Sequence, residues 1–314
     1  MNPTGFMAID TGSNATKYRL WRIDPSGHAE PVDAGRTPLR LGRGAFTQGR
    51  LEPEMMQKAE EVFVGLLKLA RRHGVEPIRA VGTSALRDAA NAADLVGRIR
   101  KATGIDIRVI SALEEARLIM EGVLAAPGVR APGVGQYLLI DIGGGSTEVI
   151  ATRPDKPSHL LSLPLGAVRL TGQFFPTLPS SGEQVAQAAR HVERTLARAG
   201  NLPPAAGERR LLGGGGSITT LYRMYSPGAP IAPPSPPDLT RDQIDELIEE
   251  ITPLAPEEIV QRYQIEEDRA EVILGGAVVA RQLLIQLGAD RVAVVWGGLC
   301  DGLLQDFLRV PAGG

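Results

Sequence analysis

The stretch LLIDIGGGSTEVI at residues 138–150 decides the fold, because it places three consecutive glycines directly after an apolar, strand-forming segment. Glycine-rich turns at strand ends let a phosphate approach the backbone closely. A P-loop would carry a lysine before its Ser/Thr, and a dinucleotide fingerprint would open a helix. No lysine precedes Ser146, and residues 147–150 are β-forming. The pattern therefore predicts a strand, a tight loop and a returning strand.

A second copy of this pattern lies in FMAIDTGSNATKYRL at residues 6–20. In both stretches an Asp, Asp10 or Asp141, is followed two residues later by Gly and four residues after that by Thr. Equal spacing of this kind indicates a duplicated hairpin unit rather than an isolated motif. Two such loops that face each other are suited to hold a phosphate between them.

Length and composition indicate a two-domain cytoplasmic protein. The 314 residues are 43% hydrophobic, which is long for one domain and supplies a sizeable core. A net charge of −2 gives no sign of a nucleic-acid or membrane partner. The single cysteine, Cys300, excludes an internal disulfide framework and fits a reducing compartment. No apolar run is long enough to span a bilayer, and the four histidines have no zinc-ligand spacing.

Hydrophobic periodicity predicts strands that alternate with helices, and hence a largely parallel α/β core. Helices are expected at residues 53–72, 91–103, 114–124, 183–199, 240–252, 255–262, 267–287 and 301–308, and strands at 6–23, 30–41, 78–82, 106–110, 137–152, 209–213 and 291–295. The Pro-Gly dipeptides in residues 127–135 predict a linker between an N-terminal domain, 1–126, and a C-terminal domain, 133–314. The last helix, 301–309, is expected to dock back on the first domain. The proline-rich residues 226–239 are interpreted as an exposed loop, with a lid or a polyproline ligand as the alternatives.

Seven stretches, taken together, resemble a known family. They are IDTGSNATKYRL, VGTSALRDAAN, VISALEEARLIMEGV, LLIDIGGGSTEV, LPLGAVRLTGQFF, GGGGSITTL and GGLCDGLL, in that order between residues 6 and 308. Their order resembles the exopolyphosphatase and guanosine pentaphosphate phosphohydrolase (Ppx/GppA) family in its short, two-domain form. The resemblance implies two actin-like α/β domains, of the ribonuclease H-like sugar kinase and chaperone ATPase superfamily, that flank a cleft and each contribute a phosphate-binding hairpin.

The resemblance also implies roles for individual residues. Phosphoanhydride hydrolysis needs contacts to the transferred oxygens, positive charge, and a group that positions or deprotonates water. By resemblance Glu115, in the EEAR segment, is the general base, Arg87 supplies charge, and Glu114 only complements the helix dipole. The expected phosphate contacts come from Gly12, Ser13, Asn14, Gly143, Gly144, Gly145, Ser146, Thr147 and Arg269. Lys17, Arg40, Arg43 and Arg169 are further candidates, equally well interpreted as surface charges or structural ion pairs.

Three carboxylates beside the loops, Asp10, Asp141 and Glu148, would repel a phosphate unless a cation lay between them. Mg²⁺, or another divalent cation, is expected because it binds carboxylates together with substrate phosphates. The resemblance favours Asp141 and Glu148 as metal ligands or, for Glu148, as a catalytic water-orienting residue. For Asp10 an ordinary strand-end cap competes with the metal role.

The sequence departs from the family at several positions. Ala15 stands where many members have Ser, Glu271 where an Asp is common, and Cys300 where an Arg is usual. The loss of that arginine weakens inference about chain-length preference and nucleotide recognition. The chain ends near residue 314, so the C-terminal His-Asp-type helical domain of longer members is not expected.

The leading hypothesis is an Mg²⁺-dependent exopolyphosphatase that releases the terminal phosphate of inorganic polyphosphate. Guanosine pentaphosphate (pppGpp), an alarmone of the stringent response, is the alternative substrate, because both compounds present a terminal phosphoanhydride. Two other hypotheses are a small kinase with its adenine pocket at GGGGSITTL, and a sensor that binds these ligands without turnover. A sensor would not need Glu115. Neither a nucleic acid nor a membrane is expected as a partner, and homodimer formation is left open.

Overall fold

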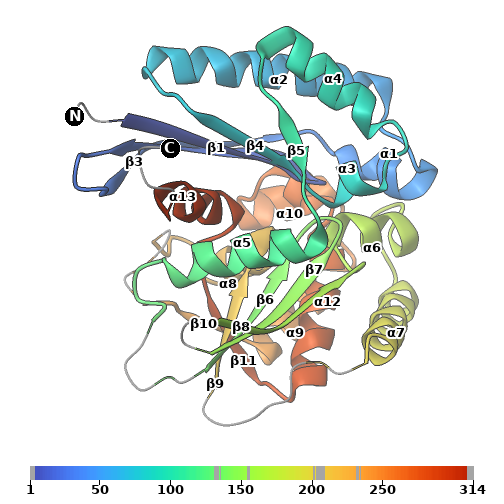
Figure 1. Cartoon of the computed structure of the whole chain (residues 1–314). Coiled ribbons are helices and arrows are strands. Elements are labelled where there is room, and N and C mark those ends of the chain that lie inside the picture. Colours follow the sequence, from blue (N-terminus) through green and yellow to red (C-terminus); the bar gives the residue numbers. More distant parts are fainter. Residues whose placement is uncertain are drawn as a thin grey trace. The chain divides into compact units, whose positions relative to one another are not determined.

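The computed structural model describes residues 4–130, 134, 136–153, 156–200, 202, 209–230, 233 and 235–309 (Figure 1). Residues 131–133 and 135 of the expected linker, and 231, 232 and 234 of the proline-rich loop, lie outside this range. The chain divides into two compact units, of which the first combines Met1–Gly122 with Gly298–Gly314 and the second is Val123–Gly297. The end of the chain thus returns to the first unit. As folding domains, 1–126 and 133–314 stay a prediction.

The first unit is built on a five-stranded mixed sheet in the order β3-β2-β1-β4-β5. Its strands are β1 (Thr4–Thr11), β2 (Ala15–Ile23), β3 (Ala29–Pro38), β4 (Ile78–Gly82) and β5 (Ile107–Val109). Its helices are α1 (Leu41–Gln48), α2 (Pro53–Arg72), α3 (Ser84–Asp88), α4 (Ala92–Thr103), α5 (Ala112–Leu124), whose last two residues enter the second unit, and α13 (Leu299–Arg309). Helices α2 and α4 cover one face of the sheet, and α13 lies against the other (Figure 1).

The second unit is built on a six-stranded sheet in the order β10-β11-β9-β6-β7-β8. Its strands are β6 (Gln136–Ile142), β7 (Thr147–Arg153), β8 (Lys156–Leu163), β9 (Arg209–Gly214), β10 (Asp238–Thr240) and β11 (Arg291–Val294). Its helices are α6 (Ala167–Phe174), α7 (Gly182–Arg198), α8 (Gly215–Tyr225), α9 (Arg241–Ile251), α10 (Pro256–Tyr263), α11 (Glu267–Ala270) and α12 (Ile273–Leu287).

The duplication inferred from the sequence extends to the topology of both sheets. The set β1, β2, β3 and β4 has the same order and directions as β6, β7, β8 and β9. The first three strands of each set are antiparallel, because short connections join them, and the fourth pairs in parallel with the first. The expectation of a largely parallel core was therefore wrong, and both sheets are mixed. The α/β fold class is confirmed.

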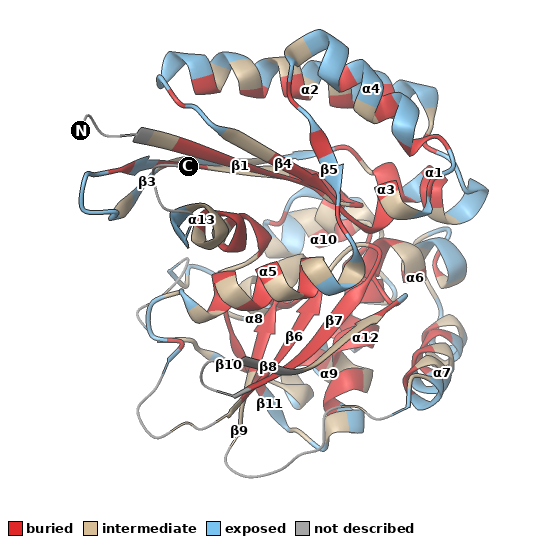
Figure 2. Cartoon of the chain, viewed as in Figure 1, coloured by how far each residue is buried: buried red, intermediate tan, exposed pale blue. Residues whose placement is uncertain are grey.

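Most expected helices are present, and one differs in kind. The amphipathic helix at 53–72 is confirmed as α2, whose exposed residues lie on the outer side in Figure 2. The single helix expected at 267–287 was wrong, because the structure has α11 and then α12 from Ile273. After the break, the start of α12 packs closely against α6. A Cβ on Gly275 would lie 2.8 Å from the Ala167 carbonyl oxygen, so the two helices approach each other there without a side chain between them. Sequence periodicity alone did not predict α1, α3, α6, α8, β8 or β10.

Candidate active site

The two glycine turns, residues 12–15 and 143–146, have the same backbone geometry. The Gly12 N–H donates to the Ala15 carbonyl at 3.2 Å, and the Gly143 N–H donates to the Ser146 carbonyl at 3.0 Å. A Cβ on either glycine would lie 3.1 Å from that carbonyl oxygen. Gly12 and Gly143 were expected to offer their N–H groups to phosphate, but those groups close the turns. The N–H groups later in each turn are therefore the better candidates for phosphate donors.

In each unit, the helix that follows the third strand of the hairpin set donates a backbone hydrogen bond to the glycine turn. In the first unit the Gly42 N–H donates to the Ser13 carbonyl at 2.7 Å. In the second unit the Val168 N–H donates to the Gly144 carbonyl at 2.8 Å. These bonds pair one carbonyl of each turn with a backbone donor of the following segment.

A second repeated motif, missed in the sequence, explains these contacts. The segment L-x-L-G occurs at residues 39–42 and again at 163–166, at the same place in the two hairpin sets. A Cβ on Gly42 would lie 2.9 Å from the Cβ of Ser13, and a Cβ on Gly166 would lie 2.5 Å from the Gly145 nitrogen. Only glycine allows the helix start to approach the turn this closely. Alignment of the two repeats beyond the strands would have found the motif.

The hydroxyl of Thr147 has a structural role as a donor. It donates to the Leu165 carbonyl in the segment that enters α6. Because a hydroxyl carries one hydrogen, this bond leaves no proton for a phosphate oxygen. Thr147 was expected among the phosphate contacts, and as a donor it instead holds the hairpin to α6. Ser146, one residue earlier, accepts through its backbone carbonyl and is buried.

The structure brings together Arg87 and Glu115, which the sequence treated as separate contributors. Arg87 Nη1 lies 2.6 Å from Glu115 Oε2 and donates to the Ile110 carbonyl at 3.0 Å. Glu115 is in the first turn of α5 and is only 7% exposed. Its neighbour Glu114 instead pairs with the exposed Arg108 at 2.5 Å. The adjacent glutamates therefore have different surroundings, one inside the first unit and one on its surface.

The two hairpins differ in the residue that faces the aspartate. Asp10 and Lys17 are cross-strand partners, and their Oδ2 and Nζ atoms are 4.0 Å apart. Burial raises the pKa of Asp10, and the Lys17 charge partly opposes this. Within the described part of the chain, Asp10 Oδ1 accepts no hydrogen bond. The first hairpin thus carries its own cation beside its carboxylate.

In the second hairpin the corresponding partners are Asp141 and Glu148, two carboxylates directly opposite each other. Opposite residues of an antiparallel pair project to the same face, and like charges there are destabilising. Both are buried, with exposed fractions of 8% and 1%. Glu148 Oε1 accepts a hydrogen bond from Ser162 Oγ at 2.8 Å, a contact that the sequence analysis missed. A divalent cation would remove the repulsion between the two groups.

The glycines of GGGGSITTL make room for charged side chains rather than for a nucleobase. A Cβ on Gly214 would lie 2.8 Å from Asp141 Oδ2, and one on Gly216 would lie 2.5 Å from the guanidinium carbon of Arg269. Gly215 has φ of +81°, which favours glycine. Arg269 therefore lies against the first turn of α8. The adenine pocket that the alternative kinase hypothesis would require at this segment finds no support in this packing.

Cys300 stands where the family resemblance led us to expect an arginine. It is a buried residue of α13. Its Sγ lies 4.0 Å from the Ala8 carbonyl, and burial raises the pKa of the thiol. A neutral buried thiol is chemically inert.

Among the described residues, no group of three or more His, Cys, Asp or Glu side chains is arranged to hold a metal ion. A metal would therefore rely on a pair such as Asp141 and Glu148, together with waters and substrate, which is typical of Mg²⁺. Within the same part of the chain, none of the helices combines the length and apolarity of a membrane span.

Comparison with known proteins identifies the family of this chain. The family model of the Ppx/GppA phosphatase family matches residues 23–310. The chain belongs to this family. It is 29% identical over 308 residues to exopolyphosphatase 1 of Mycobacterium tuberculosis, covering 98% of this chain and 89% of that protein. It is 28% identical to exopolyphosphatase 1 of Mycobacterium leprae, covering 98% and 90%.

Solved structures of the Ppx/GppA family have the same fold. The crystal structure of the Aquifex aeolicus family member matches with a TM-score of 0.78 and 28% identity, covering 99% of this chain and 100% of that one. An exopolyphosphatase from Cytophaga hutchinsonii matches with a TM-score of 0.86 and 24% identity, covering 97% and 98%. The actin-like fold expected from the sequence is therefore confirmed for this chain.

We predict that Gly166→Ala reduces phosphatase activity by about 10- to 100-fold, because its Cβ would displace the second glycine turn. Gly182→Ala is the matched control, since a Cβ there meets nothing within 4 Å. Phosphate release and thermal unfolding of both variants would be compared with the wild type. Equal activity of a folded Gly166→Ala protein would contradict the role given to this contact.

Proposed function

We propose that this protein is an exopolyphosphatase that hydrolyses the terminal phosphoanhydride of inorganic polyphosphate. The observation that carries the proposal is the ion pair of the buried Glu115 with the partly buried Arg87, in a chain of the Ppx/GppA family whose similar mycobacterial relatives are named exopolyphosphatases. A cytoplasmic location and a homodimer remain predictions.

In this proposal Glu115 is the general base. Arg87 Nη1 lies 2.6 Å from the Glu115 carboxylate, and an ionised carboxylate is the form that can accept a proton from water. The water oxygen forms a bond to the terminal phosphorus, and the bond from phosphorus to the bridging oxygen breaks. The shortened chain leaves with that electron pair, and Glu115 takes the proton of the water. Arg87, which has further guanidinium donors, offsets the charge that develops on the phosphoryl oxygens.

We assign phosphate contacts to the N–H groups of Ser13 and Asn14 in the first glycine turn, and of Gly144, Gly145 and Ser146 in the second. Their positions after the turn-closing bonds of Gly12 and Gly143 support this assignment. Successive backbone N–H groups in a tight turn form an anion-binding concavity. Arg269, at the first turn of α8, is proposed as a side-chain phosphate contact.

Asp141 and Glu148 are the residues that would hold Mg²⁺. They fit the ion because two buried carboxylates oppose each other across one strand pair, with Ser162 fixing one oxygen of Glu148. Bound there, Mg²⁺ would neutralise charge on the phosphate oxygens. Asp10 fits less well, because Lys17 already supplies a positive charge beside it.

Guanosine pentaphosphate is the second candidate substrate, since the same residues would act on its terminal phosphate. A sensor without turnover is disfavoured by the pairing of the buried Glu115 with Arg87, because ligand binding alone does not require a base.

The first experiment is phosphate release by the purified protein with Mg²⁺, supplied with long-chain polyphosphate, guanosine pentaphosphate or ATP at equal concentrations of terminal phosphate. We expect polyphosphate to be the best substrate. Preference for guanosine pentaphosphate would move the assignment to alarmone turnover, and ligand binding without release of phosphate from any substrate would contradict hydrolase function.

We predict that Glu115→Gln lowers kcat by about 100- to 10,000-fold, the range for loss of a general base, while polyphosphate still binds. Glu114→Gln is the matched control, because Glu114 is the adjacent glutamate and pairs only on the surface. Steady-state kinetics and equilibrium binding would be measured on both variants. Similar activity of the two variants would remove Glu115 from its proposed role.

We predict that Asp141→Asn and Glu148→Gln each weaken binding of Mn²⁺, used as a spectroscopic substitute for Mg²⁺, by about tenfold or more. Asp10→Asn is expected to leave Mn²⁺ affinity unchanged, because Asp10 has Lys17 as its counter-ion. Titration followed by electron paramagnetic resonance measures the affinity without turnover. Loss of affinity only in Asp10→Asn would place the ion at the first hairpin.

A further inference from the structure

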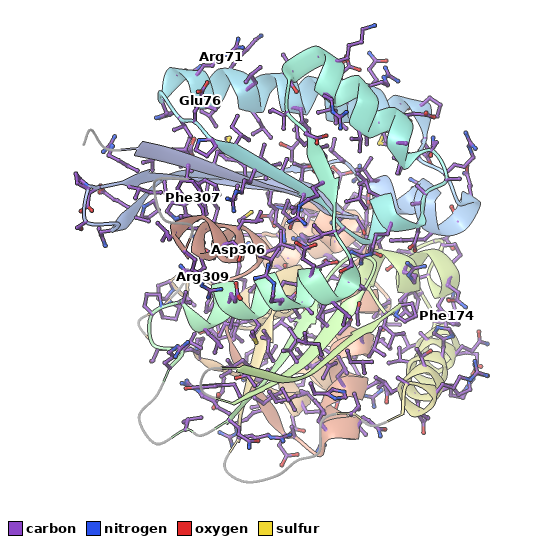
Figure 3. All side chains as sticks on the ribbon, viewed as in Figure 1. Arg71, Glu76, Phe174, Asp306, Phe307 and Arg309 are labelled. Carbon is purple, nitrogen blue, oxygen red and sulfur yellow. The ribbon has the colours of Figure 1, made fainter. Side chains whose placement is uncertain are left out.

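Helix α13 packs against β1, the strand that leads into the first glycine turn. The ring of Phe307 stacks on the ring of Phe6, with centroids 4.5 Å apart and planes 12° apart. The guanidinium of Arg79 lies 5.5 Å from the centre of the Phe307 ring. In Figure 3, Phe307 lies on the side of α13 toward the strands of the first unit, whereas Asp306 and Arg309 lie on the side toward α5. Because Phe6 is fully buried in β1, this stack ties α13 to the strand that carries Asp10.

The same helix is ion-paired to α5, which carries Glu115. Arg117 donates two parallel hydrogen bonds to Asp306, from Nη1 to Oδ1 and from Nη2 to Oδ2, both at 2.9 Å. Arg117 also donates to Glu121 at 3.0 Å, and Arg309 reaches Glu121 at 2.9 Å. The Arg117 hydrogen bond holds the pKa of Asp306 below its usual value. Bidentate pairs of this kind fix orientation as well as distance.

Two glycines bring the backbones of α5 and α13 into direct contact. A Cβ on Gly122 would lie 2.7 Å from the Gly302 nitrogen, and a Cβ on Gly302 would lie 2.6 Å from the Leu118 carbonyl carbon. No side chain fits at either position without moving a helix. Residues 115, 118 and 122 share one face of α5, because they are spaced by three and four positions. A shift of α5 at this contact would therefore move Glu115.

We propose that α13 is a positioning element for the general base: its contacts through Gly302, Asp306 and Phe307, here called the α13 brace, hold α5 at a fixed position relative to β1. The brace sets where the Glu115 carboxylate lies relative to Arg87 and the first glycine turn. None of its three residues touches the reacting atoms in this scheme. The inference rests on the proposed function only in the role that it gives to Glu115.

The brace is tested first with Gly302→Ala, whose added methyl group must push α5 and α13 apart. Because the base would be misplaced while ground-state binding of the substrate persists, kcat and kcat/KM should fall by the same factor, about 10- to 100-fold. The matched control is Gly97→Ala in α4, a helical position where a Cβ meets nothing within 4 Å. It should retain wild-type kinetics. Wild-type kinetics in a folded Gly302→Ala protein would overturn the proposal.

Asp306→Asn is the second variant, and it tests the positioning role of α13 if the Gly302→Ala protein does not fold. It keeps the size of the side chain and removes the charge that orients Arg117. We expect kcat to fall with KM unchanged, whereas the control Asp106→Asn, at an exposed pair with Arg100, should have no effect. A rise in KM with kcat unchanged would overturn the positioning role, because that pattern indicates a lost contact with the substrate.

Amide hydrogen exchange provides a readout that needs no turnover. In the wild type, α5 residues 112–118 should be protected. Both brace variants should exchange faster there, and both controls should match the wild type. Failure of the wild type to release phosphate would refute the proposed function, while the exchange data would still test the brace. Unchanged exchange in α5 of both brace variants would overturn the positioning role proposed for the α13 brace.

Discussion

The constraint on which the rest of this structure depends is the absence of a side chain at the two glycine turns and at the helix starts behind them. Gly12 and Gly143 each close a turn with one backbone hydrogen bond, and Gly42 and Gly166 let a helix start press against that turn. A methyl group at any of these positions would meet backbone or side-chain atoms at 3.1 Å or less. The close approach of each helix start to its turn, which lies two residues after Asp10 or Asp141, depends on these glycines.

The duplicated hairpins have diverged in charge while keeping the same backbone. At the position opposite the aspartate the first hairpin has Lys17, and the second has Glu148. One strand pair is thereby nearly neutral without a ligand, and the other has two buried carboxylates that favour a divalent cation. Two hairpins of the same topology therefore differ in charge at one cross-strand position.

Two glycines also determine how closely α5, which carries the candidate base Glu115, packs against α13. At Gly122 and Gly302 the absence of side chains lets α5 and α13 touch through their backbones, and the Arg117–Asp306 pair fixes their rotation. Glu115 is thus supported by a helix that is far from it in the sequence. Cys300, in the same helix, packs as a buried core residue against Ala8 of β1.

The sequence by itself determined the hairpin duplication, the family resemblance, the amphipathic helix α2 and the candidate residues beside the turns, because these depend on local spacing and periodicity. Only the tertiary structure decided that Arg87 pairs with Glu115, that Thr147 donates to Leu165 and that Lys17 offsets Asp10. It also decided that 267–287 is broken into two helices. Periodicity reports which side of an element is buried, but partners that are distant in sequence are fixed by packing. For that reason the sequence could name candidate site residues, but it could not name their partners.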